Sequence, residues 1–241
     1  MKFSVSVVAL IAIFVMSFVF TGCDKDDNPA KAENIKTFSK FFGGSEEDVG
    51  YCVQETSHGG FVIAGKTNSY GAGYSDVWLI KTDASGNELW NRTFGGSESD
   101  AGYFVQETSD GGFVITGGTT NGAGDNVALL IKTDGSGNEL WNKTFGGSDF
   151  DWGYCVQETS DGGFVITGGG LLIKTDGSGN ELWIRIIEWG NYVQETSGGG
   201  FIIAGTEASD VWLIKTDASG NELWNRNFGG DKSDGGLSVQ E

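Results

Sequence analysis

FGGSESDAGYFVQETSDGGFVITGG occupies residues 94–118, and VALLIKTDGSGNELW follows at residues 127–141. Close copies of this pair of segments stand before and after it, so the chain contains one unit four times and begins a fifth. A tryptophan closes each full unit, and successive tryptophans are 51, 42 and 41 residues apart: Trp90, Trp141, Trp183 and Trp224. Self-similarity at this period is typical of a solenoid, a propeller or an array. Residues present in every copy are therefore expected to build the unit rather than to perform chemistry.

Each unit contains four segments with the composition of β-strands. In the second copy they are residues 103–108, 113–118, 127–133 and 139–145, and turns or loops rich in glycine separate them. The segments are rich in β-branched and aromatic residues, and several are apolar on both faces, which indicates a sheet covered on both sides. No stretch shows helical periodicity. The pattern predicts an all-β propeller of four-stranded antiparallel blades.

The copies differ in completeness. The third copy lacks the loop seen in copies 1 and 2, the fourth lacks the FGGSxxDxG lead, and residues 37–42 resemble a fourth strand that precedes the first full copy. Residues 237–241 belong to the start of a fifth copy, and the sequence stops inside the first strand of that copy. We therefore expect about four blades in an incomplete ring or open arc, and a fragment of a longer gene product is one interpretation. The expected copies are residues 37–94, 95–145, 146–187, 188–228 and the partial 229–241.

The second and third copies carry a glycine pair at the end of the second strand, Gly117-Gly118 and Gly168-Gly169. With the aliphatic strand, tight turn and closing tryptophan that follow, this pattern resembles the kelch repeat over about residues 41–224. The turn also resembles that of quinoprotein propellers. The resemblance implies propeller blades and no particular activity. We expect consecutive blades to lie sheet against sheet, so that the closing tryptophans are fully buried between them. In copies 1 and 4 we align this pair with Ala64-Gly65 and Ala204-Gly205.

The amino-terminal segment reads as a targeting signal. Residues 1–22 combine a short basic start with an apolar run and small residues, as a secretory signal peptide does. Cys23 follows in a context that resembles the lipobox of bacterial lipoproteins, which implies lipid attachment there and anchoring in the outer membrane or at the cell surface. Residues 23–36 form a polar linker before the repeat domain of residues 37–241. An ordinary cleaved signal and an uncleaved membrane anchor are the alternatives.

Composition narrows the class of partner. The formal net charge is −18, which argues against binding nucleic acid or anionic lipid surfaces. The chain has 41 glycines among 241 residues, yet 12% of its residues are aromatic, so it is a turn-rich β protein rather than a disordered tail.

Carboxylates are the only polar groups repeated through the copies. The aspartates that follow each FGG lead are interpreted as turn caps, with a cation site, calcium above all, as the alternative: Asp48, Asp100, Asp151 and Asp234. The Asp-x-Ser-x-Asn turns that begin at Asp83 resemble the opening of a calcium loop but fit a hairpin turn better. A glutamate ends each first strand and would line a central channel if these strands face the axis: Glu55, Glu107, Glu158 and Glu195.

Cysteine and histidine offer little chemistry. Cys52 and Cys155 occupy one repeated position, which holds Phe104 and Tyr192 in the other copies, so this position indicates a packing role. Equivalent positions two repeats apart are expected to lie far apart in space, too far for a disulfide between Cys52 and Cys155. His58, the only histidine, is interpreted as a turn residue. We find no catalytic motif, and no cofactor is indicated.

The first hypothesis for function is a lipid-anchored extracytoplasmic propeller that binds a protein or glycan through its variable loops, residues 66–75, 119–126 and 206–209. A polysaccharide-acting hydrolase or lyase with acidic catalytic residues is the second. A fragment without independent activity is the third.

Overall fold

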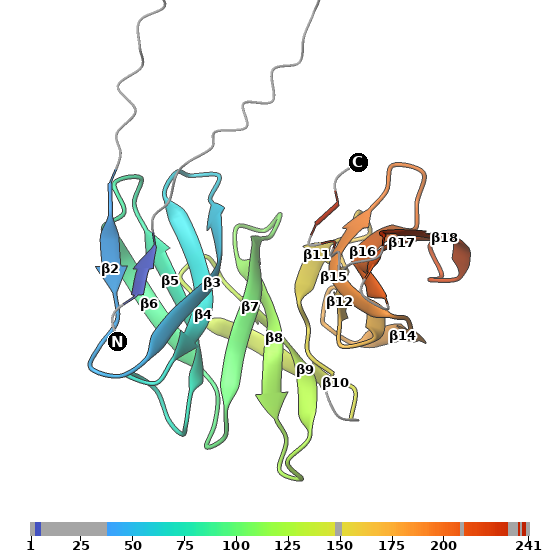
Figure 1. Cartoon of the computed structure of the whole chain (residues 1–241). Helices are drawn as coiled ribbons and strands as arrows, with labels where there is room; N and C mark the ends of the chain where they lie inside the picture. The colour runs from blue at the N-terminus through green and yellow to red at the C-terminus, as the bar shows by residue number, and fades with distance from the viewer. Residues whose placement is uncertain are drawn as a thin grey trace, which may run out of the picture.

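The computed structural model of the chain describes residues 3–5, 38–147, 151–207, 210–230, 236 and 238–239. Throughout these residues the structure is all-β, and no helix long and apolar enough to cross a membrane occurs among them. Four sheets each contain four antiparallel strands in chain order. Figure 1 shows the sheets following one another from the blue and teal strands of the first copy to the orange and red strands of the fourth. The architecture is that of propeller-like blades in an open arc, as the repeat predicts.

The four blades share one strand order. The first strands of consecutive blades contact one another and therefore form the inner side of the arc. Blade 1 contains β3 (Asp48–Glu55), β4 (Phe61–Thr67), β5 (Asp76–Thr82) and β6 (Glu88–Phe94); blade 2 contains β7 (Asp100–Glu107), β8 (Phe113–Thr120), β9 (Asn126–Thr133) and β10 (Glu139–Phe145). Blade 3 contains β11 (Cys155–Glu158), β12 (Phe164–Gly168), β13 (Leu171–Thr175) and β14 (Glu181–Ile186); blade 4 contains β15 (Trp189–Glu195), β16 (Phe201–Glu207), β17 (Asp210–Thr216) and β18 (Glu222–Phe228).

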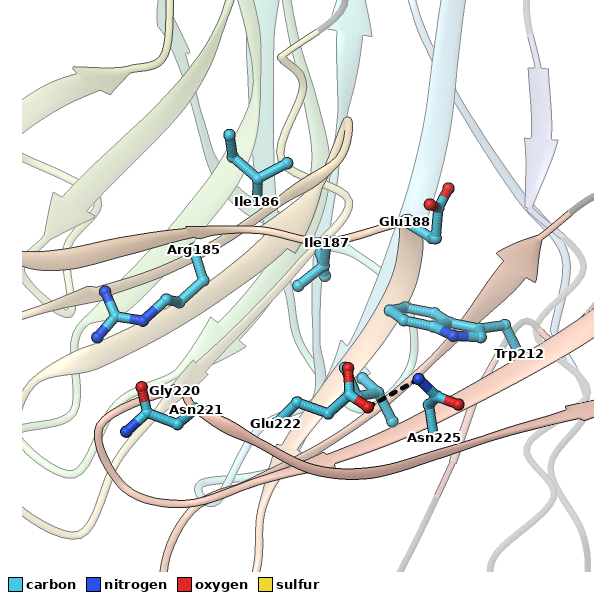
Figure 2. Close-up of a pocket in the computed structure, with 10 residues that line it drawn as sticks. Arg185, Ile186, Ile187, Glu188, Trp212, Gly220, Asn221, Glu222 and Asn225 are labelled. Atoms are coloured by element: carbon cyan, nitrogen blue, oxygen red, sulfur yellow. Dashed lines mark hydrogen bonds between the residues drawn. The ribbon is translucent and has the colours of Figure 1, made fainter.

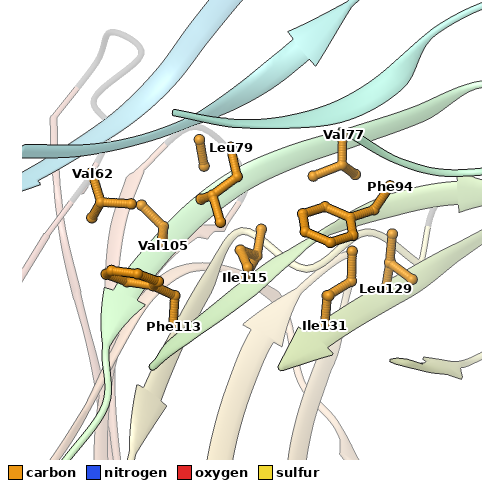
Figure 3. Packing of buried hydrophobic residues seen from close by; sticks show 10 residues of the cluster. Val62, Val77, Leu79, Phe94, Val105, Phe113, Ile115, Leu129 and Ile131 are labelled. Carbon is orange, nitrogen blue, oxygen red and sulfur yellow. The ribbon is translucent and has the colours of Figure 1, made fainter. Parts of the chain in front are cut away.

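The hydrophobic core lies between blades rather than inside any one of them. Val62 and Leu79 of blade 1 pack against Val105, Ile115 and other buried residues of blade 2 (Figure 3). Similar clusters join blade 2 to blade 3 and blade 3 to blade 4. This arrangement explains why the strands are apolar on both faces, because blades 2 and 3 have a neighbouring blade on each face. On the outer face of blade 1 a smaller cluster of Ile63, Trp78 and Ile80 packs against Phe42 instead.

The turn between the third and fourth strands is fixed by its aspartate. Asp83 Oδ1 accepts hydrogen bonds from the backbone amides of Ser85 and Asn87, both at 2.8 Å, and Asn87 Nδ2 donates to Asp83 Oδ2 at 2.9 Å. The hydrogen bonds from Asn87 hold the pKa of Asp83 below its ordinary value. The other three blades repeat this turn, at Asp134, Asp176 and Asp217. Both carboxylate oxygens of each aspartate accept hydrogen bonds from groups within the same turn, which supports the hairpin interpretation over the calcium loop.

The repeated glycine of the second strand is needed because the first strand comes very close. In blade 2 the pairing of β7 with β8 shifts register after Gly102. A Cβ on Gly117 would lie only 1.8 Å from the carbonyl oxygen of Ala101, so no larger residue fits there. The equivalent glycines meet the same contact at 1.9 Å, namely Gly65, Gly168 and Gly205. The repeated residue is thus the first glycine of each pair, and our sequence alignment of the pairs with Ala64-Gly65 and Ala204-Gly205 was wrong by one residue.

A short strand precedes blade 1, at the place of a fourth strand. This strand, β2 (Lys40–Phe42), pairs with β1 (Phe3–Val5). Just before it, Phe38 packs on Phe61 with ring centroids 5.8 Å apart. In the same way Trp90 packs on Phe113 of blade 2 at 5.9 Å. The segment 37–42 therefore occupies the position that its sequence predicts, although residue 37 lies outside the described part.

The closing tryptophans lie between blades but are not sealed from water. Trp90, Trp141 and Trp183 are half-buried, and each packs against a phenylalanine of the following blade at 5.9 Å. Trp224 in the last blade is 37% exposed. The most deeply buried indoles are instead Trp78 and Trp212 in the third strands, at 2% and 3% exposure. The expectation of fully buried closing tryptophans is therefore corrected to a partial cover.

Candidate functional site

A row of contacting aromatic rings runs along the inner strands. Tyr103 lies 5.1 Å from Tyr51 of blade 1, 5.9 Å from Trp152 and 5.8 Å from Tyr154 of blade 3, measured between ring centroids. Tyr154 lies 6.3 Å from Trp189 of blade 4. We call these five residues the aromatic row. Because the first strands converge, one or two rings from each blade form a continuous surface across all four blades.

The rings of the aromatic row combine apolar area with polar tips. Tyr51 is 46% exposed and Trp189 is 47% exposed, whereas the three rings between them are half-buried. Burial, with smaller contributions from Tyr51 and Tyr154, raises the pKa of Tyr103 to about 12. The Tyr103 hydroxyl is therefore protonated at neutral pH and is available as a hydrogen-bond donor as well as an acceptor.

A cavity of about 200 Å³ adjoins one end of the aromatic row. Tyr51, Tyr103 and Trp152 form its aromatic part, and Gly118 lies beneath the indole, where a Cβ would come within 2.6 Å of Trp152 Cδ1. The polar part comes from hydroxyl, amide and amino side chains at strand ends and in the loops after β4 and β6: Lys66, Ser75, Ser99, Thr119, Thr120 and Asn126. Two of the three variable loops named from sequence thus contribute to it; residues 208–209 of the third are outside the described part.

The aspartates after the FGG leads act as caps. Asp48 Oδ2 accepts hydrogen bonds from the Gly44 amide at 2.8 Å and the Ser69 hydroxyl at 2.7 Å, and Asp48 Oδ1 accepts one from Thr67. Burial by itself would raise the pKa of Asp48, but these hydrogen bonds outweigh it and hold the pKa below its ordinary value. Asp100 and Asp151 accept from the amides of the glycines four residues before them, at 3.0 Å and 2.9 Å.

The geometry of these aspartates supports the capping interpretation over a cation site. Among the residues that the structure describes, no three His, Cys, Asp or Glu side chains cluster closely enough to hold a metal ion. Asp234 lies outside those residues.

The glutamates of the first strands join blades instead of lining a channel. Glu158 of blade 3 accepts hydrogen bonds from both the amide and the hydroxyl of Ser109 in blade 2, each at 2.7 Å. Gln106 Oε1 in turn accepts from the Glu158 amide at 2.7 Å. Glu107 and Glu195 bind the serine of the preceding blade in the same way. The proposed ring of free carboxylates is therefore wrong for these three residues.

Side chains fill the axis where the first strands converge. Phe104 of blade 2 and Tyr192 of blade 4 lie in edge contact, with ring centroids 6.3 Å apart. Cys52 and Cys155 are free thiols, and burial raises the pKa of Cys155 to about 12, with Cys52 close enough to contribute. Positions two repeats apart thus meet at the axis, which corrects our expectation that they lie far apart, while the packing role stands.

His58 lies in the turn between β3 and β4, as its sequence position predicts. Its Nδ1 lies 3.1 Å from the Ser57 hydroxyl, which also donates to Glu107 at 2.9 Å. The exposed serine is thus engaged in the contact between blades 1 and 2.

A second hollow, of about 500 Å³, lies at the junction of blades 3 and 4 (Figure 2). The matching junction of blades 1 and 2 holds only about 220 Å³, because the lead residues that the fourth copy lacks are present there. Arg185 donates to the Ser219 carbonyl at 2.7 Å. Glu222 accepts from Asn225 at 2.7 Å (Figure 2). These groups serve contacts of the blades themselves, so the aromatic row is the stronger candidate site.

Sequence reasoning missed the aromatic row. Tyr51, Tyr103 and Tyr154 repeat at one position, and repeated residues were assigned to the scaffold. Trp152 and Trp189 stand at the variable position two residues before that tyrosine position. An aromatic residue where other copies have Val49 and Ala101 was the available signal.

Comparison with known proteins identifies the fold alone. No family profile matches the sequence, and no curated protein matches it. Among solved structures, the chain is similar to the crystal structure of a protein of unknown function from Bacteroides caccae, with a TM-score of 0.55 and 11% sequence identity. The similarity covers 78% of this chain and 64% of that one, so the chain spans less than two thirds of that structure.

Proposed function

We propose that this protein is a non-catalytic binding module that receives its ligand on the aromatic row and in the adjoining cavity. The observation that carries the proposal is the surface of five contacting rings contributed by all four blades, with hydroxyl and amide side chains beside it. Concave surfaces that join aromatic area to a few polar groups are typical of ligand sites.

The repeated acidic groups favour binding over catalysis. A polysaccharide-acting enzyme would need an acid and a base free to exchange protons with its substrate. Asp100, the one carboxylate that lines the cavity, is 4% exposed and accepts a hydrogen bond from the Gly96 amide. Glu107 and Glu158 are engaged between blades.

The proposal includes export and lipid anchoring, which rest on the sequence of residues 1–22 and on Cys23. Residues 3–5 of the expected signal peptide form β1, which pairs with β2, so cleavage before Cys23 would remove that strand from the domain. Residues 6–37 lie outside the described part, so the signal peptide, Cys23 and the linker of residues 23–36 remain predictions. Palmitate labelling in a bacterial host tests them: the label is expected in the wild-type chain and should vanish in Cys23→Ala. Labelling that persists in that variant would contradict a lipid anchor.

The binding function itself is tested with a matched pair of variants. Tyr51→Ala removes a 46% exposed ring from the aromatic row, and Phe41→Ala removes a 62% exposed ring in β2, outside the row, the cavity and the variable loops. Both variants and the wild type are screened against immobilised oligosaccharides and peptides, and bound ligands are then checked for conversion by mass spectrometry. We expect binding without conversion, lost in Tyr51→Ala and kept in Phe41→Ala. Equal binding by the two variants, or ligand conversion, would refute the proposal.

A further inference from the structure

We infer that the ligand of the aromatic row is a neutral glycan. This inference rests on the proposed binding function and adds the chemical class of the ligand. The mixture of groups at the site is the starting point. Flat aromatic rings stack on the C–H faces of pyranose rings, while short hydroxyl and amide side chains exchange hydrogen bonds with sugar hydroxyls. The site offers both, since rings of Tyr51, Tyr103 and Trp152 share one cavity with Thr119, Thr120 and other polar residues.

The charges at the cavity disfavour an ionic ligand. Among the described residues that line it, Lys66 is the one cation, and it is paired with Glu47 at 3.5 Å. Its only acidic residue, Asp100, is buried and accepts a hydrogen bond from the Gly96 amide. An anionic polymer would in addition face a protein of net charge −18. A ligand that is polar but uncharged matches a lining in which each charge is already satisfied.

The inner strands are not free to bind a peptide by strand addition. That mode needs unpaired backbone groups along a sheet edge. Here the first strands face one another, and side chains of the preceding blade bind their amides: Gln54 Oε1 accepts from the Glu107 amide at 2.8 Å, and Gln157 does the same for the Glu195 amide. Recognition must therefore run through side chains and ring faces.

The dimensions of the site indicate an extended ligand. A cavity of about 200 Å³ is smaller than the 300–1,000 Å³ or so of sites for drug-sized molecules, so it suits one compact unit. The aromatic row continues beyond it through Tyr154 to the exposed ring of Trp189. A chain of sugar units would place one unit in the cavity and further units along the row.

The test titrates the full mature chain by calorimetry with soluble probes of four kinds. They are neutral gluco- and manno-oligosaccharides, an oligogalacturonate, a lysine-rich peptide and an uncharged peptide. Three variants accompany the wild type. Tyr51→Ala removes a ring of the row, Gly118→Ala displaces the Trp152 indole that lies 2.6 Å from the added Cβ, and Phe41→Ala, which removes an exposed ring outside the site, is the control. Circular dichroism and the thermal midpoint show that each variant is folded.

We expect neutral oligosaccharides to bind, and Tyr51→Ala and Gly118→Ala to weaken that binding by about tenfold or more while Phe41→Ala leaves it unchanged. Binding of a peptide that depends on the same two residues would overturn the glycan inference and leave the binding function standing. Glycan binding that is insensitive to both variants would place the site elsewhere and overturn the inference. If no probe binds in a manner that depends on the row, both the inference and the proposed function fail.

Discussion

The packing of blade on blade predicts unequal costs for one substitution at two equivalent positions. Phe145 ends the fourth strand of blade 2 and is 8% exposed, because blade 3 covers it. Phe228 ends the fourth strand of blade 4 and is 54% exposed. The two residues share their place in the repeat, their strand type and their chemistry, so Phe145→Ala and Phe228→Ala differ mainly in whether a neighbouring blade packs on the ring.

The expected magnitudes follow from burial. Transfer of a fully buried phenylalanine side chain from water is worth about 1.5–3 kcal/mol, and nearly all of this is lost in Phe145→Ala. A cavity between blades 2 and 3 adds to the loss, which brings it to about 3–4 kcal/mol, within the range for Phe→Ala in cores. The Phe228→Ala substitution loses about half of the transfer contribution and leaves no enclosed cavity, so we expect it to lower the free energy of unfolding by about 1 kcal/mol.

Guanidinium unfolding followed by far-ultraviolet circular dichroism measures both costs. The dependence on denaturant has to be recorded for each variant, because repeat proteins unfold in parts when an interface between neighbouring units weakens. A lower slope in Phe145→Ala would itself indicate that the blade 2–blade 3 interface had separated. Equal costs at the two positions would refute the view that the blades are held mainly by their facing surfaces.

Three further predictions concern polar contacts within and between blades. Glu158→Ala should cost about 0.5–1.5 kcal/mol in the same unfolding assay, the net contribution of a typical hydrogen bond, because the Ser109 donors that lose their carboxylate are exposed to water; no change would show that water replaces the carboxylate fully. His58→Asp should raise the free energy of unfolding by up to about 1 kcal/mol and raise the thermal midpoint in low salt. Burial lowers the pKa of Lys81, which contacts this turn, and an aspartate here would stabilise its charge, as Asp110 does for Lys132; a lower midpoint would contradict this. The pKa of Asp110, about 2, is below its ordinary 3.8 through hydrogen bonds and the charge of Lys132 that outweigh burial. Its contribution is therefore fully present above about pH 4 and is lost as the pH falls through about 2. Asp110→Asn should destabilise by less than about 1 kcal/mol near neutral pH, where the exposed carboxylate is screened, and by only a small part of that at pH 2; an equal cost at both pH values would contradict the linkage.

The sequence was sufficient for the blades because their determinants are local and repeated. The Asp83 turn and the alternation of apolar strands with glycine-rich turns specify each sheet without knowledge of its neighbours. The register of the glycine pair was misjudged because its cause is a bulge in a different strand, which brings the Ala101 carbonyl onto Gly117. No residue pattern within the second strand alone predicts that contact.

The site was out of reach for a related reason. Tyr51 and Tyr103 are 52 positions apart in sequence, and their contact depends on the angle between two blades, which the repeat does not encode in any one residue. The same angle brings Phe104 to Tyr192 across the axis. The interpretation of the first-strand glutamates failed for a different reason. Their repetition suggested a ring of carboxylates around a channel, but each repeated glutamate binds the serine of the preceding blade.

The break in the repeat makes the aromatic row asymmetric, and this matters for how it works. The tyrosine of the first three blades is replaced in blade 4 by Asn191, whose Nδ2 donates to the Gly236 carbonyl at 2.9 Å. Ring stacking is therefore strongest over blades 1 to 3, and Trp189 alone continues it into blade 4. The cavity lies at the opposite end, beside Tyr51 and Tyr103. A repetitive ligand would consequently bind in one preferred direction, with its best-held unit at blades 1 and 2, even though the scaffold beneath is built from nearly identical units.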